Sequence, residues 1–278
     1  MLKVLIRTFL PSSLWTRLRL IRLWCSIRFY RARVVRHDYC TYPLVLYVAD
    51  PMGAGWYDHD WPQLAEIELL KLGRLKPSAR VFDLGAHQCV VALILAKTVG
   101  TDGFVLALEP HLHNVAVGER NRELNDVKQL RIVHGAVTTT SGMIAMNKGL
   151  NSQVEDGSHE WGSMQVPSFS IDDLSMKYGT PDVLFIDVEG FECRALSGAA
   201  DTLKSRPDCF VEVHLGEGLE KFGSVAELLS FFSRENYRLF VRTETEEHFA
   251  ELRDESELPR ERFFMVALNR WTQAERPD

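Results

Sequence analysis

The sequence predicts an α/β fold in which a mostly parallel sheet is covered by helices on both faces. The chain has 278 residues, 46% of them hydrophobic, which is enough to bury a sizeable core. Short apolar runs of strand length alternate with segments of helical spacing. One of these runs turns through Gly85 directly into a helix. Alternation of this kind is typical of a parallel sheet, because each parallel pair needs a long crossover connection.

Seven apolar runs are expected to form this sheet. They cover residues 80–85, 104–109, 130–137, 183–187, 209–214, 237–243 and 262–269. The last two runs are joined by an acidic, hydrophilic connector that has no clear apolar crossover helix. A short connection implies an antiparallel pair at the edge of the sheet. We therefore expect a seven-stranded, mostly parallel sheet with an antiparallel last strand.

The segments around these strands complete the predicted fold. Residues 44–50 alternate like a short strand, and residues 61–75 have helical spacing. A further helix is expected to begin at Ser224, where Glu227 completes a capping box. The stretch 141–168, rich in Gly, Ser, Asn and Met, is interpreted as a loop or short hairpin over the mouth of the site.

We divide the chain into a basic N-terminal arm with a lead-in strand over residues 1–55, a main domain over 56–272 and a tail over 273–278. The first 37 residues contain nine Lys and Arg and no acid, although the whole chain has a formal charge of −6. The main body is therefore strongly acidic, which disfavours nucleic acid as its partner. Five cysteines without CxxC or metal-ligand spacing favour a reduced, cytoplasmic protein.

The basic arm interleaves apolar and charged residues. Leu14, Trp15, Leu18, Ile21 and Trp24 alternate with Arg17, Arg19, Arg22 and Arg28. An amphipathic helix there would make residues 1–36 a peripheral contact with the inner, anionic face of a membrane, or it would cover one end of the domain with its arginines in solvent. Arginine recurs too often for a spanning helix, and the segment does not resemble a signal peptide.

The turn after the first sheet strand is interpreted as a cofactor loop. A strand that turns through Gly85 into a helix points backbone N–H groups at a ligand above the sheet, and the next strand ends at Glu109, where a ribose would be held. A dinucleotide motif would place glycine at the positions of His87 and Val90. The sequence therefore favours S-adenosylmethionine, which has no pyrophosphate, over NAD. A turn that binds no ligand is the alternative.

Carboxylates follow the strand 183–187 at the edge of the sheet where such folds bind ligands. We interpret Asp187 and Glu189 as functional residues. Glu192 is interpreted as an acid at a helix N-terminus, where it gains from the helix dipole without a catalytic role.

The next strand ends at His214, which would emerge at the same edge as Asp187. Imidazole titrates near neutral pH and suits removal of a proton from a hydroxyl that attacks a methyl group. A histidine satisfied within the core is the alternative. His111 and His113 have no third metal ligand nearby in the sequence and are interpreted as loop residues.

Several motifs, taken in order, resemble the FkbM family of methyltransferases. They are VFDLGAHQC, LALEP, RNRELN, SIDDL, FIDVEGFE and FVEVH, and the resemblance covers about residues 56–270. It implies the Rossmann-like class I methyltransferase fold, whose seven-stranded sheet has an antiparallel last strand. It also implies transfer of a methyl group from S-adenosylmethionine, usually to a hydroxyl on a sugar or secondary metabolite.

The resemblance implies roles for individual residues as well. Asp83, Gly85, Ala86, His87 and Gln88 look like the cofactor loop, Glu109 like the ribose-binding acid, and Ala136 like a residue beside the adenine. Asp187 and Glu189 resemble the pair beside the transferred methyl group, where Asp187 also meets the cofactor, and His214 resembles the histidine after the following strand. One departure is Cys89, at a position that is usually glycine in the family.

The leading interpretation is an S-adenosylmethionine-dependent O-methyltransferase that acts on a small-molecule or glycan acceptor. A non-catalytic, membrane-associated binding protein on a degenerate scaffold is the alternative raised by Cys89 and the arm. A version in which Asp187 and Glu189 hold Mg²⁺ is not favoured, and no metal site is predicted. Trp56, Tyr57 and Trp61 are candidates for stacking on a sugar, although packing is the better interpretation for Trp61. The acceptor and the oligomeric state are left open.

Overall fold

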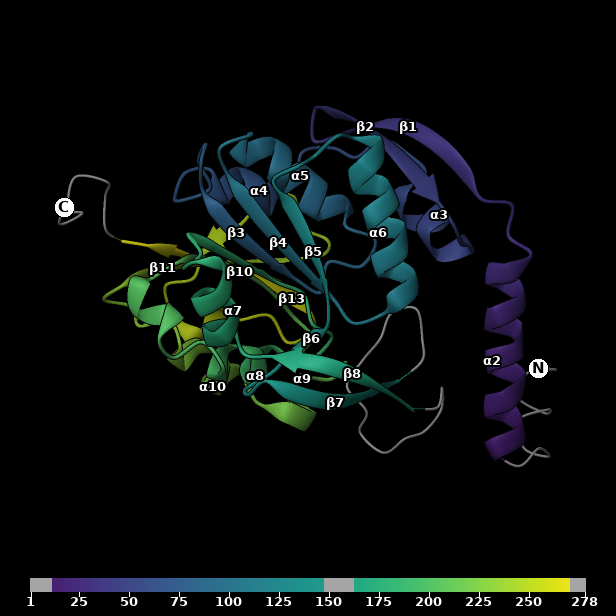
Figure 1. Cartoon of the computed structure of the whole chain (residues 1–278). Coiled ribbons are helices and arrows are strands. Elements are labelled where there is room, and N and C mark those ends of the chain that lie inside the picture. The colour runs from purple at the N-terminus through teal and green to yellow at the C-terminus, as the bar shows by residue number, and fades with distance from the viewer. Residues whose placement is uncertain (1–11, 148–162, 271–278) are drawn as a thin grey trace.

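The fold is built around one mixed sheet. We describe it from a computed structural model, in which residues 12–147 and 163–270 are described (Figure 1). The strands of the central sheet are β3 (Arg80–Leu84), β4 (Phe104–Glu109), β5 (Leu130–His134), β9 (Val183–Ile186), β10 (Asp208–Val213), β11 (Tyr237–Thr243), β12 (Ala250–Glu251) and β13 (Phe263–Asn269). Their order across the sheet is β12-β11-β13-β10-β9-β3-β4-β5. Each of the seven predicted runs therefore contributes a strand to this sheet.

The strand directions follow the prediction. From β5 to β10, neighbouring strands are parallel. Strand β13 is antiparallel to both β10 and β11, so the last strand is inserted between its neighbours. The additional strand β12 pairs with the outer edge of β11. It was not predicted, because two residues are too few to show a period.

Two hydrophobic cores lie on opposite faces of the sheet. Alternate residues of each strand enter different cores, as when Val81 joins one and Phe82 the other. The first core includes side chains from α4 (Ala65–Leu70) and α5 (Val90–Val99). The second includes side chains from α7 (Ile171–Tyr178), α8 (Glu192–Ser197), α9 (Leu219–Phe222) and α10 (Val225–Ser230). Helices therefore cover both faces, as expected.

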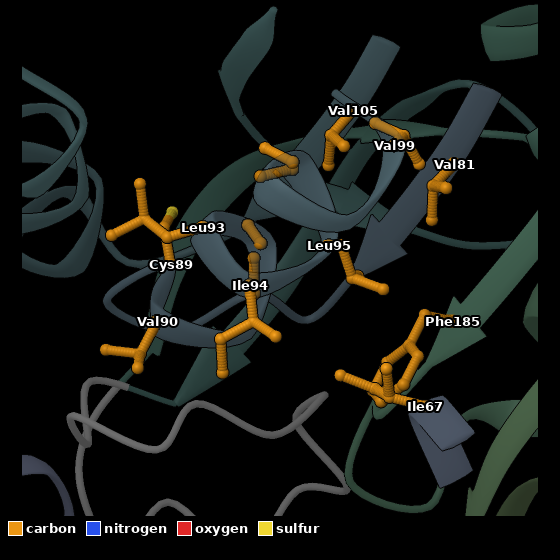
Figure 2. Close-up of a cluster of buried hydrophobic side chains, with 14 of the residues drawn as sticks. Ile67, Val81, Cys89, Val90, Leu93, Ile94, Leu95, Val99, Val105 and Phe185 are labelled. Atoms are coloured by element: carbon orange, nitrogen blue, oxygen red, sulfur yellow. The ribbon is translucent and has the colours of Figure 1, made fainter. Parts of the chain in front are cut away.

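Helix α5 is apolar around most of its circumference and is accordingly buried. Figure 2 shows Leu93, Ile94 and Leu95 among side chains from the neighbouring strands. Cys89 precedes the helix with a left-handed φ of 63°, which explains why glycine suits this position. Its sulfur faces Gly118, where an added Cβ would lie 2.6 Å from Sγ. Cys89 is therefore a core residue.

The lead-in segment forms a hairpin of β1 (Arg33–Tyr39) and β2 (Tyr42–Val48), followed by α3 (Pro51–Tyr57). The expected strand over 44–50 is thus present, but its partner β1 begins inside the predicted arm. Two asparagines hold β2: Asn121, which lies in α6 (Leu112–Leu124), and Asn125, which is the C-cap residue of that helix. Asn121 accepts a hydrogen bond from Tyr47 N (2.7 Å), and Asn125 accepts one from Val45 N (2.9 Å).

The helix expected over 61–75 is shorter, covering only Ala65–Leu70. Trp61 is held in an extended conformation instead. Its backbone N–H donates to Asp38 O and its carbonyl accepts from Cys40 N, so it pairs with the end of β1. Helix α10, in contrast, begins at the predicted cap, where Ser224 Oγ accepts a hydrogen bond from Glu227 N (3.1 Å). Two 3₁₀ turns cover Thr202–Ser205 and Glu255–Glu257.

The segment predicted as a loop or hairpin contains β7 (Gly142–Asn147) and β8 (Ser163–Phe169), which pair antiparallel. Strand β6 (Ala136–Val137) joins them, so the predicted run 130–137 is divided between two sheets.

At the N-terminal end of the described chain, the basic arm forms α2 (Ser12–Arg28). No helix in the described ranges is both long and apolar enough to cross a bilayer.

Candidate active site

A pocket of about 390 Å³ opens at the carboxyl ends of the central strands. This volume is within the range of small-molecule sites. Among the residues that line it are Trp56, Tyr57, Trp61, Asp83, Gly85, Ala86, His87, Glu109, Ala136, Asp187, Glu189, Glu212 and Arg262. The structure therefore brings most of the predicted site residues together, while Gln88 and His214 lie buried behind the wall.

Gly85 shapes the floor of the pocket. Its φ is +94°, and a Cβ at this position would overlap the carbonyl oxygen of Asp187. The backbone N–H of Asp187 also donates to Leu84 O (3.0 Å). The loops after β3 and β9 thus touch backbone to backbone, so this turn requires glycine.

Glu109 is fixed by three hydrogen bonds. Its carboxylate accepts from His87 N (2.9 Å), His111 N (2.9 Å) and Asn114 Nδ2 (3.0 Å). Burial raises its pKa to about 8 against the opposing effect of these bonds. The bond from His87 N joins the loop after β3 to the end of β4.

Asp83 also lies on the pocket wall. Burial raises the pKa of this carboxyl to about 7. Within the described structure its Oδ2 atom is buried and accepts no hydrogen bond. A buried polar atom without a partner is costly, so this oxygen is available to a ligand that carries a donor group.

An aromatic wall closes one side of the pocket. The hydroxyl of Tyr57 and His87 Nδ1 share a hydrogen bond (2.7 Å), and the ring of Trp56 lies 4.9 Å from that of His87. Burial lowers the pKa of His87 to about 4, so this imidazole is neutral at physiological pH. Trp61 packs against Tyr39 and Tyr57, in agreement with its packing interpretation.

Gln88 supports the pocket from behind. Its side-chain amide donates to Asp50 Oδ2 (2.7 Å), and His113 Nε2 contacts the same oxygen (2.9 Å). Asp50 is fully buried and also caps α3. Sequence analysis did not identify Asp50, although an aspartate directly before Pro51 is a recognisable helix cap.

Three carboxylates surround the imidazole of His214. Its Nε2 atom lies 3.5 Å from Glu189 Oε2 and 3.7 Å from both Asp187 Oδ1 and Glu212 Oε1. Within the described residues, Asp187 Oδ1 is a buried oxygen that accepts no hydrogen bond. We call these four residues the acidic cluster. It stands at the predicted edge of the sheet, beside the glycine turn.

Glu192 holds the other side of His214. The imidazole Nδ1 donates to Glu192 Oε1 (2.6 Å), which also accepts from Gly190 N (2.9 Å). Glu192 does lie in the first turn of α8, as interpreted from the sequence, but it is completely buried. Its bond to His214 orients Nε2 toward the carboxylates. The sequence signal for the role of Glu192 is the FIDVEGFE motif, of which it is the third acid. The interpretation of Glu192 as only an acid at a helix N-terminus does not include its contact with His214.

These contacts shift the protonation of the acidic cluster. Burial lowers the pKa of His214, but the hydrogen bond with Glu192 and the charges of Glu192, Glu189 and Asp187 raise it to about 9. Desolvation and the charge of Glu212 raise the pKa of Asp187 well above its usual value. Groups coupled this closely share their protons, so a measured pKa belongs to the whole cluster.

Arg262 adds a positive charge that sequence analysis missed. Its guanidinium forms an ion pair with Glu212, with 2.6 Å between a guanidinium nitrogen and Glu212 Oε1. Arg262 directly precedes β13, and an antiparallel strand begins where its parallel neighbours end.

Ligand atoms of Asp187, Glu212 and His214 lie within 4.8 Å of one another, a spacing that a divalent cation also accepts. Because Arg262 already neutralises Glu212, we keep the prediction of a metal-free site.

The pocket fits a nucleoside cofactor with a charged amino-acid end. Asp83 Oδ2 and Asp187 Oδ1 are buried acceptors near Gly85, where the backbone leaves no Cβ in the way. Ala136 and Met146 supply apolar surface for a base, and Glu109 lies at the end of β4. The acidic cluster, in contrast, presents groups that can take a proton.

Comparison with known proteins gives one family match. A family model described as "Methyltransferase FkbM domain" matches residues 83–239, more than half of the chain. No curated protein sequence matches this chain.

Among solved structures, the methyltransferase FkbM from Methylobacillus flagellatus is 17% identical with a TM-score of 0.45 and covers 68% of this chain. The match spans 43% of that protein, so this chain corresponds to less than half of its length. A SAM-dependent O-methyltransferase from Thermotoga maritima is 13% identical, with a TM-score of 0.44, and the match covers 85% of this chain and 77% of that one. A SAM-dependent methyltransferase from Aquifex aeolicus is 15% identical, with a TM-score of 0.42, over 78% and 93% of the two chains.

Proposed function

This chain belongs to the FkbM family of methyltransferases, and we propose that it transfers the methyl group of S-adenosylmethionine to a hydroxyl on a sugar or other secondary metabolite. One observation carries the choice of a hydroxyl. A buried histidine, oriented by Glu192, faces three carboxylates beside the glycine turn. A hydroxyl that attacks a methyl group must lose its proton, and this cluster provides groups that accept it.

The cofactor would lie on the loop after β3 and at the end of β4. Gly85 admits it, Asp83 and Asp187 would bind its amino group, and Glu109 would bind its ribose hydroxyls. When bound, S-adenosylmethionine supplies a methyl group attached to a positively charged sulfur. This arrangement would place the positive charge near Asp187 and the acidic cluster, which favours binding through simple charge attraction.

The acidic cluster would position and deprotonate the acceptor. As the hydroxyl oxygen bonds to the methyl carbon and the bond from that carbon to sulfur breaks, the hydroxyl proton would pass through Asp187 or Glu189, which line the pocket, to the buried His214 Nε2. Alignment of oxygen, carbon and sulfur supplies the remaining acceleration. Because the pKa of His214 is about 9, the imidazole is charged at neutral pH in the free protein. We therefore expect kcat/KM to increase as the pH rises toward 9.

The aromatic wall supports a sugar acceptor. Trp56 is 42% exposed at the pocket, and its ring is held against His87. Exposed aromatic rings beside hydrogen-bonding carboxylates suit the mixed apolar and hydroxylated faces of a sugar. We expect Trp56→Ala to raise KM for such an acceptor without a change in cofactor affinity.

The first test is calorimetric titration of the protein with S-adenosylmethionine. We expect one site per chain. Glu109→Gln should weaken binding about tenfold or more, because glutamine keeps only one acceptor oxygen and its NH₂ group would face a donor among His87 N, His111 N and Asn114 Nδ2. Glu123→Gln, which changes an exposed acid at the end of α6, is the control and should bind normally. The absence of binding heat would overturn the proposal and favour the non-catalytic binding protein.

The second test follows labelled methyl transfer to a panel of hydroxylated sugars and metabolites. Product is expected with one acceptor class, and EDTA should leave the rate unchanged because we predict a metal-free site. Loss of turnover on chelation, restored by Mg²⁺ or Mn²⁺, would replace the metal-free version with a metal-assisted one.

A further inference from the structure

Helix α2 lies outside the body of the molecule. Figure 1 shows it at the right edge of the structure, below the beginning of β1 and away from the central sheet. The chain continues from it into β1 through residues 29–32. Nothing in the proposed methyl transfer uses this helix, so its surface needs a separate explanation.

The described side chains of α2 include large apolar groups in solvent. Leu18, Ile21 and Trp24 are 44%, 57% and 60% exposed. Steps of three residues keep successive side chains on one side of a helix. Phe29 follows the helix, is 77% exposed and contacts Trp24 edge to face, with ring centroids 6.2 Å apart. Single exposed apolar residues are ordinary, whereas a contiguous group on one element indicates a binding surface.

Exposed basic side chains flank this apolar group along the chain. Arg22 and Arg28 are exposed on the helix itself, and Arg31 and Arg36 follow it on the surface. The first 37 residues hold nine basic residues and no acid, whereas the whole chain has a net charge of −6. An anionic surface would therefore attract this segment and repel the rest of the protein, so that the arm meets it first.

We infer that α2 and Phe29 dock on a bilayer surface that contains anionic lipids. Trp24, Ile21 and Phe29 would enter the boundary between headgroups and acyl chains, while the arginines pair with lipid phosphates. Nucleic acid offers no apolar layer for exposed isoleucine and tryptophan side chains. A symmetric pairing of α2 with the same helix of a second copy would bring the same positive charges against each other. A bilayer satisfies both the apolar group and its charge.

The test is sedimentation of the full chain with phosphatidylcholine vesicles that contain or lack phosphatidylserine. We expect binding only where phosphatidylserine is present, and weaker binding as salt is added. Replacing Arg22 and Arg28 with glutamine should reduce the affinity by about fivefold for each arginine, because each basic residue near such a surface contributes about 1 kcal/mol. Ile21→Ala combined with Trp24→Ala should also weaken binding, and this loss should remain at high salt.

Two other exposed apolar residues provide matched controls. Leu72 and Met176 are 77% and 78% exposed elsewhere on the protein, so Leu72→Ala and Met176→Ala should bind vesicles like the unmodified chain. All variants should unfold at the same temperature, since each changed side chain lies at the surface. If the chain with both Ile21→Ala and Trp24→Ala bound the vesicles as strongly as the unmodified chain, the inference would be overturned. So would a dimer, or a complex with RNA, that forms through these residues without any binding to vesicles.

Discussion

The two halves of the pocket are formed by different kinds of groups, one mainly by backbone and the other by charged side chains. At the ends of β3 and β4, the shape comes from backbone, because Gly85 lies against the carbonyl of Asp187 and Glu109 ties His87 N in place. At the ends of β9 and β10, the site consists of side-chain charge gathered around His214. The first half we call the glycine half, and the second is the acidic cluster already defined.

The difference teaches where each half is sensitive. A turn packed backbone to backbone has no room for an added atom, so it responds to substitution by losing its structure. A group of charges can keep its shape while its protonation changes, so it responds by altering rate and pH dependence. Substitutions in each half should therefore fail in different ways.

The largest effect is expected for Gly85→Ala. The added Cβ overlaps Asp187 O, and the positive φ of 94° is unfavourable for alanine. We expect a loss of about 3 kcal/mol or more in the free energy of unfolding, measured by urea denaturation. The matched control is Gly55→Ala in α3, where an added Cβ meets nothing within 4 Å. It should stabilise the protein by up to about 1 kcal/mol. Equal stability of the two variants would remove the contrast between the halves.

The next effect is the loss of rate in His214→Gln. We expect kcat to fall by about 10²–10⁴, as for removal of a general base, while the affinity for S-adenosylmethionine changes by less than about threefold. Titration calorimetry and initial rates measure the two quantities separately. His248→Gln, at an exposed histidine, should behave like the unmodified enzyme. A near-normal rate in a folded His214→Gln protein would assign the proton to another residue.

Glu192→Gln tests the acidic cluster through the pH dependence of kcat/KM. Glutamine can still accept the bond from His214 Nδ1, but it removes a charge that helps to raise the pKa of His214 to about 9. A group that must lose its proton to act as a base works above its pKa, so the rise of kcat/KM should move to lower pH by about one unit or more. Glu217→Gln, an exposed acid on the outer side of Arg262, should leave the profile unchanged. A profile that loses amplitude without moving would mean that Glu192 is only structural.

The smallest effect is expected for Cys89→Gly. The thiol packs on Gly118 in the core, and Cys89 already adopts the left-handed conformation that glycine accepts. Affinity for S-adenosylmethionine should therefore stay within about threefold by calorimetry. A large gain in affinity would show that the thiol obstructs the cofactor. It would then explain why glycine is usual at this position in the family.

Local patterns in the sequence predicted the frame of the fold. All seven strands of the parallel and antiparallel pattern are present, and the acids that follow β9 stand at the pocket, because the carboxyl ends of parallel strands meet at one edge. Errors arose where distant contacts overrode local periodicity. Trp61 has helical neighbours in sequence, yet its backbone pairs with Asp38 and Cys40. The start of β1 was hidden within a basic segment, since a strand held by its partner needs no strong pattern of its own.

The sequence by itself determined where the strands lie along the chain, the glycine turn and the two acids after β9, because each depends on residues adjacent in the chain. Only the tertiary structure decided that Glu192 orients His214, that Arg262 reaches Glu212, and that Gln88 faces Asp50 rather than the pocket. These pairs join residues that are 22 to 50 positions apart. Periodicity places a side chain on a face, but its partner is set by which strands pack together, and a buried charge keeps only the partner that the packing supplies.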